Sequence, residues 1–162
     1  MSEIKIVHNK NGAAHQLPDT IIVHSMGEYV LQDDRKTYLH APDFLDKSGL
    51  SAHALVSPDG TIYRCRNDDE GAYHARGFNS NSLGIEVLVK GRHDYDSFMS
   101  AIRKQYVSEF QYQAVLEQCL EWVHSFDISR IVRHSDVSPG RKYDPGSGFP
   151  WARLLNDIQR GK

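Results

Sequence analysis

The stretch Ser82–Val89, SLGIEVLV, is the most apolar run in the chain. A short continuous apolar run of this kind predicts a buried strand in the centre of a sheet. Its one charged residue is Glu86, and a lone carboxylate in such a strand is costly to bury unless it is paired or functional. The stretch therefore predicts the centre of the fold and, within it, a candidate catalytic carboxylate.

Further β-like runs lie on both sides of this stretch. Two of them flank Ser57-Pro58-Asp59-Gly60, a Pro-Asp-Gly turn signal that predicts a hairpin. The remaining two are short apolar runs that each end in a histidine. The predicted strands besides the central one are Thr20–His24, Ala52–Val56, Thr61–Arg66 and Ile128–His134.

Helical patterns alternate with these strands. Apolar residues recur at helical spacing over Ser108–Phe126, and shorter helices are predicted at Pro42–Lys47 and Phe149–Gln159. The polar Arg92–Lys104 is expected to be an exposed loop, and the Gly- and Pro-rich His134–Gly148 a long ordered loop. This alternation predicts an α/β fold with a mixed central sheet flanked by helices.

Length and composition limit the classes of function. No repeat or linker-like stretch divides the 162 residues, so we expect a single domain over residues 1–162. The net charge of −2 argues against nucleic acid as a partner. No apolar run approaches the ~18–20 residues of a membrane span. The N-terminal residues lack the pattern of a secretory signal, which predicts synthesis in the cytoplasm, with release on lysis as one route out.

Three residues have the types and placement of a metal site. The chain has nine histidines, and two of them, His24 and His134, each end a predicted strand and open a loop. Asp144 follows His134 by ten residues, in a loop that prolines and glycines could turn back on itself. Two imidazoles and one carboxylate suit Zn²⁺ and leave a fourth position for water, which is the arrangement of catalytic zinc. We therefore expect one zinc ion per chain.

Two further residues fit the hydrolysis of an amide at such a site. The reaction needs a proton carrier and a partner for the negative charge that develops on the carbonyl oxygen. Glu86, in the central strand, is a candidate for the first role. Lys142 lies two residues before Asp144, close enough in the chain to be a candidate for the second.

With these residues in place, the chain resembles the zinc-dependent N-acetylmuramoyl-L-alanine amidases of the type-2 superfamily, which also includes the peptidoglycan recognition proteins. The resemblance covers about Thr20 to Trp151, with the family's elements in order. The motifs that carry it are the strand ending in His24, Ser51-Ala52-His53 with the Asp59-Gly60 turn, Tyr73-His74-Ala75, Asn81-Ser82-Leu83-Gly84-Ile85-Glu86, and the run His134-Ser-Asp-Val-Ser-Pro-Gly-Arg-Lys-Tyr-Asp-Pro-Gly146.

The resemblance implies cleavage of the amide between N-acetylmuramic acid and the L-alanine of the stem peptide, so the expected partner is peptidoglycan or a muropeptide. By motif position, His24, His134 and Asp144 match zinc ligands. Glu86 matches the carboxylate that assists proton transfer, and Lys142 the cation near the oxyanion. The resemblance also implies that His74 and Asn81 bind substrate, because they fall in segments that line the cleft in relatives.

One departure narrows the resemblance. Some relatives carry a catalytic tyrosine where this chain has Ala52, and others have cysteine as the third ligand in place of Asp144. The pattern here is more similar to the anhydro-muropeptide amidases, and it places more of the proton transfer on Glu86.

Several alternatives remain open from the sequence. The chain could be a non-catalytic peptidoglycan-binding module of the same fold, or a zinc peptidase that cuts within the stem peptide. As an amidase it could be a phage endolysin acting on polymeric wall or a cytoplasmic recycling enzyme. A monomer is the default expectation.

Overall fold

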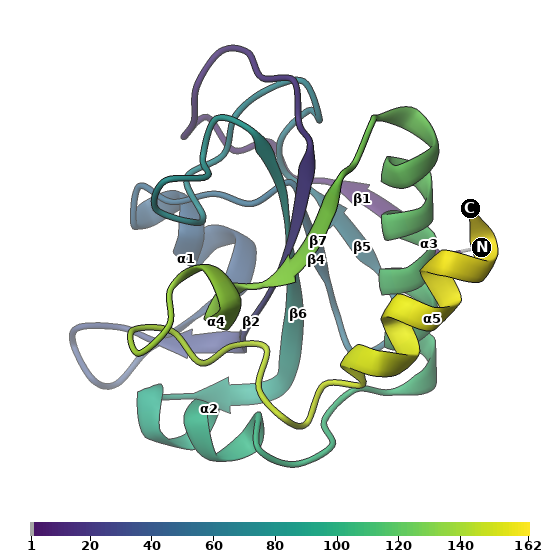
Figure 1. Ribbon diagram of the computed structural model, residues 1–162. Helices are drawn as coiled ribbons and strands as arrows, with labels where there is room; N and C mark the ends of the chain where they lie inside the picture. The colour runs from purple at the N-terminus through teal and green to yellow at the C-terminus, as the bar shows by residue number, and fades with distance from the viewer. Residues whose placement is uncertain (1) are drawn as a thin grey trace.

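The computed structural model describes residues 2–162, which fold around a seven-stranded mixed sheet (Figure 1). The strand order is β1-β5-β4-β6-β2-β3, and β7 pairs with β2 beside that path. The strands are β1 Ile4–Ile6, β2 Thr20–Leu31, β3 Tyr38–His40, β4 Ala54–Val56, β5 Ile62–Arg64, β6 Ser82–His93 and β7 Arg130–Arg133. The α/β fold with a mixed sheet flanked by helices is thereby confirmed.

The two long strands β2 and β6 form the centre of this sheet. They run parallel, with Thr20 opposite Ser82 and His24 opposite Glu86. Both strands are longer than the sequence predicted, because Gly27-Glu28 in β2 and Lys90-Gly91-Arg92 in β6 interrupt the apolar runs and the ends of both strands are only partly buried. The prediction that His24 ends its strand is therefore wrong: β2 continues to Leu31, where it pairs with β3. The edge strands β1 and β3 were not predicted, since three residues give little periodic signal.

The helices divide between the two faces of the sheet. Helices α3 (Glu109–Ser125) and α5 (Trp151–Gly161) cover one face, seen on the right in Figure 1, and α1 (Ala41–Lys47) packs on the other. Two regions that were predicted as loops contain short helices. Helix α2 (Tyr95–Ala101) begins with a capping box formed by Asp94 and Ser97, and α4 (His134–Val137) directly follows β7.

Side chains alternate between these faces along each strand. In β6, Leu83, Ile85 and Val87 enter the core under α3 and α5, whereas Leu88 enters the smaller core under α1. Glu86 has the parity of Leu88, so it lies on the α1 face, and the register brings His24 beside it. The apolar stretch therefore anchors the sheet through one set of residues and offers polar groups through the other.

The chain contains two free cysteines, Cys65 and Cys119, and both are buried in the core as expected. None of the helices within residues 2–162 is long and apolar enough to cross a membrane.

A buried histidine ties the segment between β5 and β6 to the central strand. Nδ1 of His53 accepts the backbone N–H of Gly84 at 3.1 Å, so the ring proton lies on Nε2, which donates to the carbonyl oxygen of Glu70 at 2.7 Å. Burial of the ring lowers the pKa of His53 to about 4. His53 is therefore neutral and structural, in agreement with its position outside the predicted site.

This buried histidine predicts a loss of stability in acid. As the pH falls from 6.5 towards 4, the unfolded chain binds a proton at His53 that the folded chain does not, so the free energy of unfolding falls by about 1.4 kcal/mol per pH unit from this residue. Urea unfolding of metal-free wild type and His53→Gln at several pH values measures it. We expect the variant to be less stable near neutral pH and the difference to shrink in acid. If the difference in the free energy of unfolding between wild type and variant did not depend on pH, His53 would not be a buried neutral histidine with a lowered pKa.

Candidate metal and catalytic site

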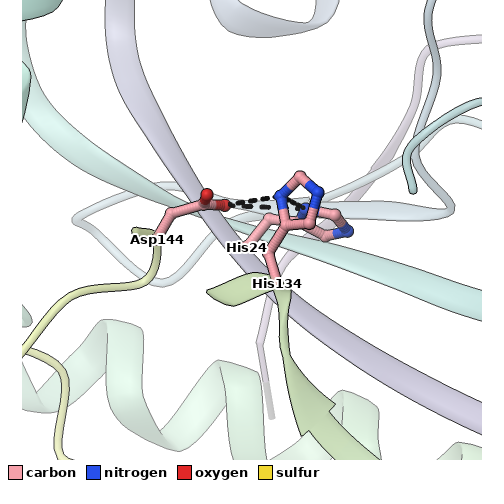
Figure 2. Close-up of side chains that lie close together, drawn as sticks. All are labelled: His24, His134 and Asp144. Carbon is pink, nitrogen blue, oxygen red and sulfur yellow. Dashed lines mark hydrogen bonds and ion pairs between the residues drawn. The ribbon is translucent and has the colours of Figure 1, made fainter. Parts of the chain in front are cut away.

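Three predicted metal ligands meet on the α1 face of the sheet. Figure 2 shows the two imidazoles turned towards the carboxylate of Asp144. Nδ1 of His24 lies 2.9 Å from Nδ1 of His134, and Oδ2 of Asp144 lies 3.2 Å from the His134 nitrogen and 3.6 Å from the His24 nitrogen. All three residues are buried, and among residues 2–162 they are the group of histidine, cysteine and acidic side chains able to hold a metal ion.

The sheet and one loop position these ligands. His24 projects from the middle of β2. His134 is the first residue of α4, and it reaches the same place because β7 pairs with β2 up to Arg133 opposite Val23. Asp144 returns along the loop after α4: its carbonyl oxygen accepts the N–H of Ser135, and Oδ2 accepts the N–H of Ser25 on β2. The loop thus folds back to His134, as its prolines and glycines predicted.

The spacing of the three donor atoms fits a small tetrahedral cation. Atoms bonded to tetrahedral zinc at about 2.0–2.2 Å lie about 3.3–3.6 Å from one another, and the distances here are 2.9, 3.2 and 3.6 Å. Burial would raise the pKa of Asp144, but its contacts with His134 and His24 outweigh burial and hold the pKa well below the usual range. Burial lowers the pKa of His24. An ionised carboxylate beside a neutral imidazole is the protonation state that metal binding requires. The three residues can therefore bind a metal ion.

Glu86 lies beside this group, and one of its own carboxylate oxygens forms no hydrogen bond. It faces His24 across the β2–β6 pair, and Oε1 is buried with no partner among residues 2–162. Burial, together with the charge of Asp144, raises the pKa of Glu86 well above its ordinary value. The positive charge of Lys142 opposes this shift, which places that lysine within electrostatic reach. A buried, unsatisfied carboxylate with a raised pKa is typical of a proton carrier.

These residues line one cleft of about 660 Å³. Lys142, Arg141 and Tyr143 border it from the loop after α4. Other walls come from the segment before β6 and from α2, and they supply Tyr73, His74, Arg76, Asn79, Tyr95, Phe98 and Met99. The individual α2 residues were not predicted, because Arg92–Lys104 was interpreted as an exposed loop. The Asp94–Ser97 capping box, followed by Phe98, was the sequence signal for this helix.

The two residues expected to bind substrate do not offer free polar groups to the cleft. His74 lines it, but its Nδ1 lies 2.8 Å from Nε2 of His24 and its Nε2 lies 3.0 Å from Oγ of Ser82. Both ring nitrogens are therefore engaged inside the protein. Asn81 is not among the residues that line the cleft; its side chain donates to Asp19 at 3.3 Å. Asn79, and not Asn81, is the asparagine at the cleft wall, and a role of Asn81 in substrate binding stays a prediction.

Ala52, which stands where some relatives have a tyrosine, is fully buried in the core under α1. It brings no polar group to the cleft, and Glu86 stays the predicted proton carrier.

Comparison with known proteins identifies the family. A family model described as N-acetylmuramoyl-L-alanine amidase matches residues 14–147. The chain is 31% identical over 116 residues to the 1,6-anhydro-N-acetylmuramyl-L-alanine amidase AmpD of Haemophilus influenzae, a match that covers 68% of this chain and 59% of that protein. The chain thus matches about three fifths of the length of this relative.

Two solved structures share the fold. The N-acetylmuramoyl-L-alanine amidase LysC from Clostridium intestinale has a TM-score of 0.72 at 20% identity, over 98% of this chain and 99% of that chain. The amidase AmiD from Escherichia coli, in complex with the substrate anhydro-N-acetylmuramic acid-L-Ala-D-γ-Glu-L-Lys, has a TM-score of 0.66 at 23% identity, over 90% of this chain and 59% of that chain. At these identities the likeness concerns the fold. Because the family match extends from before His24 to beyond Asp144, the chain belongs to the N-acetylmuramoyl-L-alanine amidase family.

Proposed function

We propose that this chain hydrolyses the amide bond between N-acetylmuramic acid and the L-alanine of the peptidoglycan stem peptide, using one zinc ion held by His24, His134 and Asp144. The observation that carries the proposal is the buried group of three ligand atoms with the unpartnered Glu86 oxygen beside it. Membership of the amidase family supports the bond, and the amidases AmpD and AmiD are named for the same linkage. We take residues 1–162 as one catalytic domain, because the site is built on one sheet: His24 and Glu86 lie on its central strands, and β7, which pairs with β2, leads directly into His134.

The donor set favours zinc. Two imidazole nitrogens and one carboxylate oxygen suit a borderline cation better than Mg²⁺ or Ca²⁺, which prefer oxygen ligands. Three protein ligands would also leave a fourth coordination position for water. Zinc bound there would polarise the amide carbonyl group and lower the pKa of water.

The side chains around this position have complementary roles in the proposal. Oε1 of Glu86 accepts a proton from the attacking water, and the carboxyl group then returns that proton to the nitrogen of L-alanine as the C–N bond breaks. The raised pKa of Glu86 suits this exchange, because a group whose pKa is closer to the working pH both takes up and releases a proton. The ammonium group of Lys142 stabilises the negative charge that develops on the lactyl carbonyl oxygen.

Two other functions for this fold make different predictions. A non-catalytic binding module would be expected to lack part of the reaction machinery, whereas this chain retains the complete ligand group and Glu86. A peptidase would cut within the stem peptide. Mass spectrometry of the products separates these cases: the amidase releases a sugar with a free lactyl carboxylate and a peptide that begins with L-alanine.

The bond is common to polymeric wall and to soluble muropeptides. Comparing turnover on isolated sacculi with turnover on an anhydro-muropeptide identifies the preferred form of the substrate, and therefore separates an endolysin from a recycling enzyme.

Removal of one ligand tests the metal. His134→Ala should abolish stoichiometric zinc and lower kcat/KM for muropeptide cleavage by about a hundredfold or more, because Lewis-acid activation contributes several kcal/mol. Zinc content by elemental analysis and product formation by mass spectrometry measure the two effects. The control is His124→Ala, which removes an exposed histidine on α3. Full activity in His134→Ala, or wild-type protein that takes up no zinc, would refute the proposal.

Replacement of the carboxylate tests proton transfer separately from metal binding. Glu86→Gln keeps the size of the side chain, so zinc affinity should stay within a few-fold of wild type while kcat falls by about 10²–10⁴-fold. Glu121→Gln, at an exposed position on α3, serves as the matched control. A variant that keeps the wild-type kcat would show that Glu86 carries no proton in the rate-limiting chemistry.

A further inference from the structure

A chain of hydrogen bonds leads away from the metal group into the segment before β6. Nε2 of His24 lies 2.8 Å from Nδ1 of His74, whose Nε2 lies 3.0 Å from Oγ of Ser82. Oγ of Ser82 in turn lies 2.6 Å from the carbonyl oxygen of Phe78. This series of hydrogen bonds therefore begins at the imidazole ring of His24 and ends at the backbone carbonyl oxygen of Phe78.

That end point fixes the direction of every bond in the chain. A carbonyl oxygen only accepts, so the hydroxyl of Ser82 donates to Phe78 and its Oγ accepts from His74. The proton of a neutral His74 ring is then on Nε2, and its Nδ1 is free to accept from Nε2–H of His24. With its proton on Nε2, His24 presents a bare Nδ1 to His134, Asp144 and the metal position.

From this polarity we infer that His74 is a positioning residue that holds His24 in the tautomer able to bind the metal. The inference rests on the proposed function, because it assigns to His24 the role of metal ligand. The opposite tautomer of His74 would direct its proton at Nε2 of His24, and a neutral His24 would then carry its own proton on Nδ1, where it blocks coordination. Partners of this kind, which fix a ligand histidine through its second nitrogen, raise metal affinity.

The packing around His74 supports a fixed ring. One strand neighbour is Gly84 in β6, where a Cβ atom would lie 2.5–2.8 Å from three atoms of the His74 ring. A residue with a side chain at this position would push the ring out of place, so the glycine gives His74 room to reach His24. The backbone N–H of Gly84 is itself held by His53. Strand β6 thus helps to hold the His74 ring in the position from which it contacts His24.

The hydrogen bonds of His74 to His24 and Ser82 also explain why a histidine lies in the cleft wall without a ring nitrogen free to bind substrate. Both ring nitrogens are engaged within the protein, so a substrate can contact only the edge or face of the ring. Substitution of a residue that binds substrate through hydrogen bonds would mainly change KM. A residue that positions a ligand changes metal affinity even when no substrate is present.

The first test measures zinc affinity by competition with a chromophoric chelator. His74→Phe keeps the ring shape but removes both hydrogen bonds, and we expect it to weaken zinc binding about 10–100-fold. His74→Asn can place an amide oxygen near the position of Nδ1, so it should recover most of that loss. His15→Phe, the same substitution at an exposed histidine, should leave the affinity unchanged. Urea unfolding of the metal-free variants reports any general loss of stability, which a merely structural role would produce equally in Phe and Asn.

The second test observes the tautomers directly in wild-type protein. Long-range ¹H–¹⁵N correlation spectra distinguish a protonated Nδ1 from a protonated Nε2, and we expect Nε2–H for both His74 and His24, with and without zinc. A proton on Nδ1 of His74 would overturn the inference, as would wild-type zinc affinity in His74→Phe or equal losses in Phe and Asn. If wild-type protein binds no zinc, the proposed function fails, and the tautomers of the metal-free protein still decide the direction of these hydrogen bonds.

Discussion

The parallel pairing of β2 with β6 is the constraint on which the rest of the structure depends. It sets His24 opposite Glu86, so that the proposed metal ligand and the proposed proton carrier lie on adjacent strands with no flexible loop between them. The same two strands bury Ile21, Val23, Leu83, Ile85 and Val87 under α3 and α5. Because a one-residue slip would turn every side chain to the opposite face, the core that stabilises the sheet also fixes which residues reach the cleft.

Asp144 completes the site by closing a loop onto this rigid pair. The carboxylate accepts the N–H of Ser25 and approaches both imidazoles, so one side chain joins the loop after α4 to β2 and to His134. Burying a carboxylate is unfavourable unless such partners are present. The same partners keep it ionised, whereas Glu86 next to it has fewer and its pKa rises. Two neighbouring carboxylates thus acquire different properties, one suited to binding a cation and the other to moving a proton.

Much of this could be predicted from sequence, for reasons that differ between residues. The apolar run around Glu86 and the helical periodicity of α3 predicted the core. The Gly- and Pro-rich loop predicted that Asp144 returns to His134. The position of His24 in the middle of β2 was missed, because Gly27-Glu28 interrupts the apolar residues after it, and the end of the strand is set by pairing with β6 and β3. The roles of His74 and Asn81 depend on which hydrogen bonds they form, and motif position contains no information about that. Helix α2 was missed because a short, exposed helix with no buried residue shows little periodicity.

Anomalous diffraction from crystals of the zinc-loaded protein, recorded on both sides of the zinc absorption edge, tests the central claim most directly. We expect one zinc peak per chain, at about 2.0–2.2 Å from Nδ1 of His24, Nδ1 of His134 and a carboxylate oxygen of Asp144, with its fourth side facing the cleft. A peak bound by other residues, or a fully loaded protein with no peak between these three, would contradict the site.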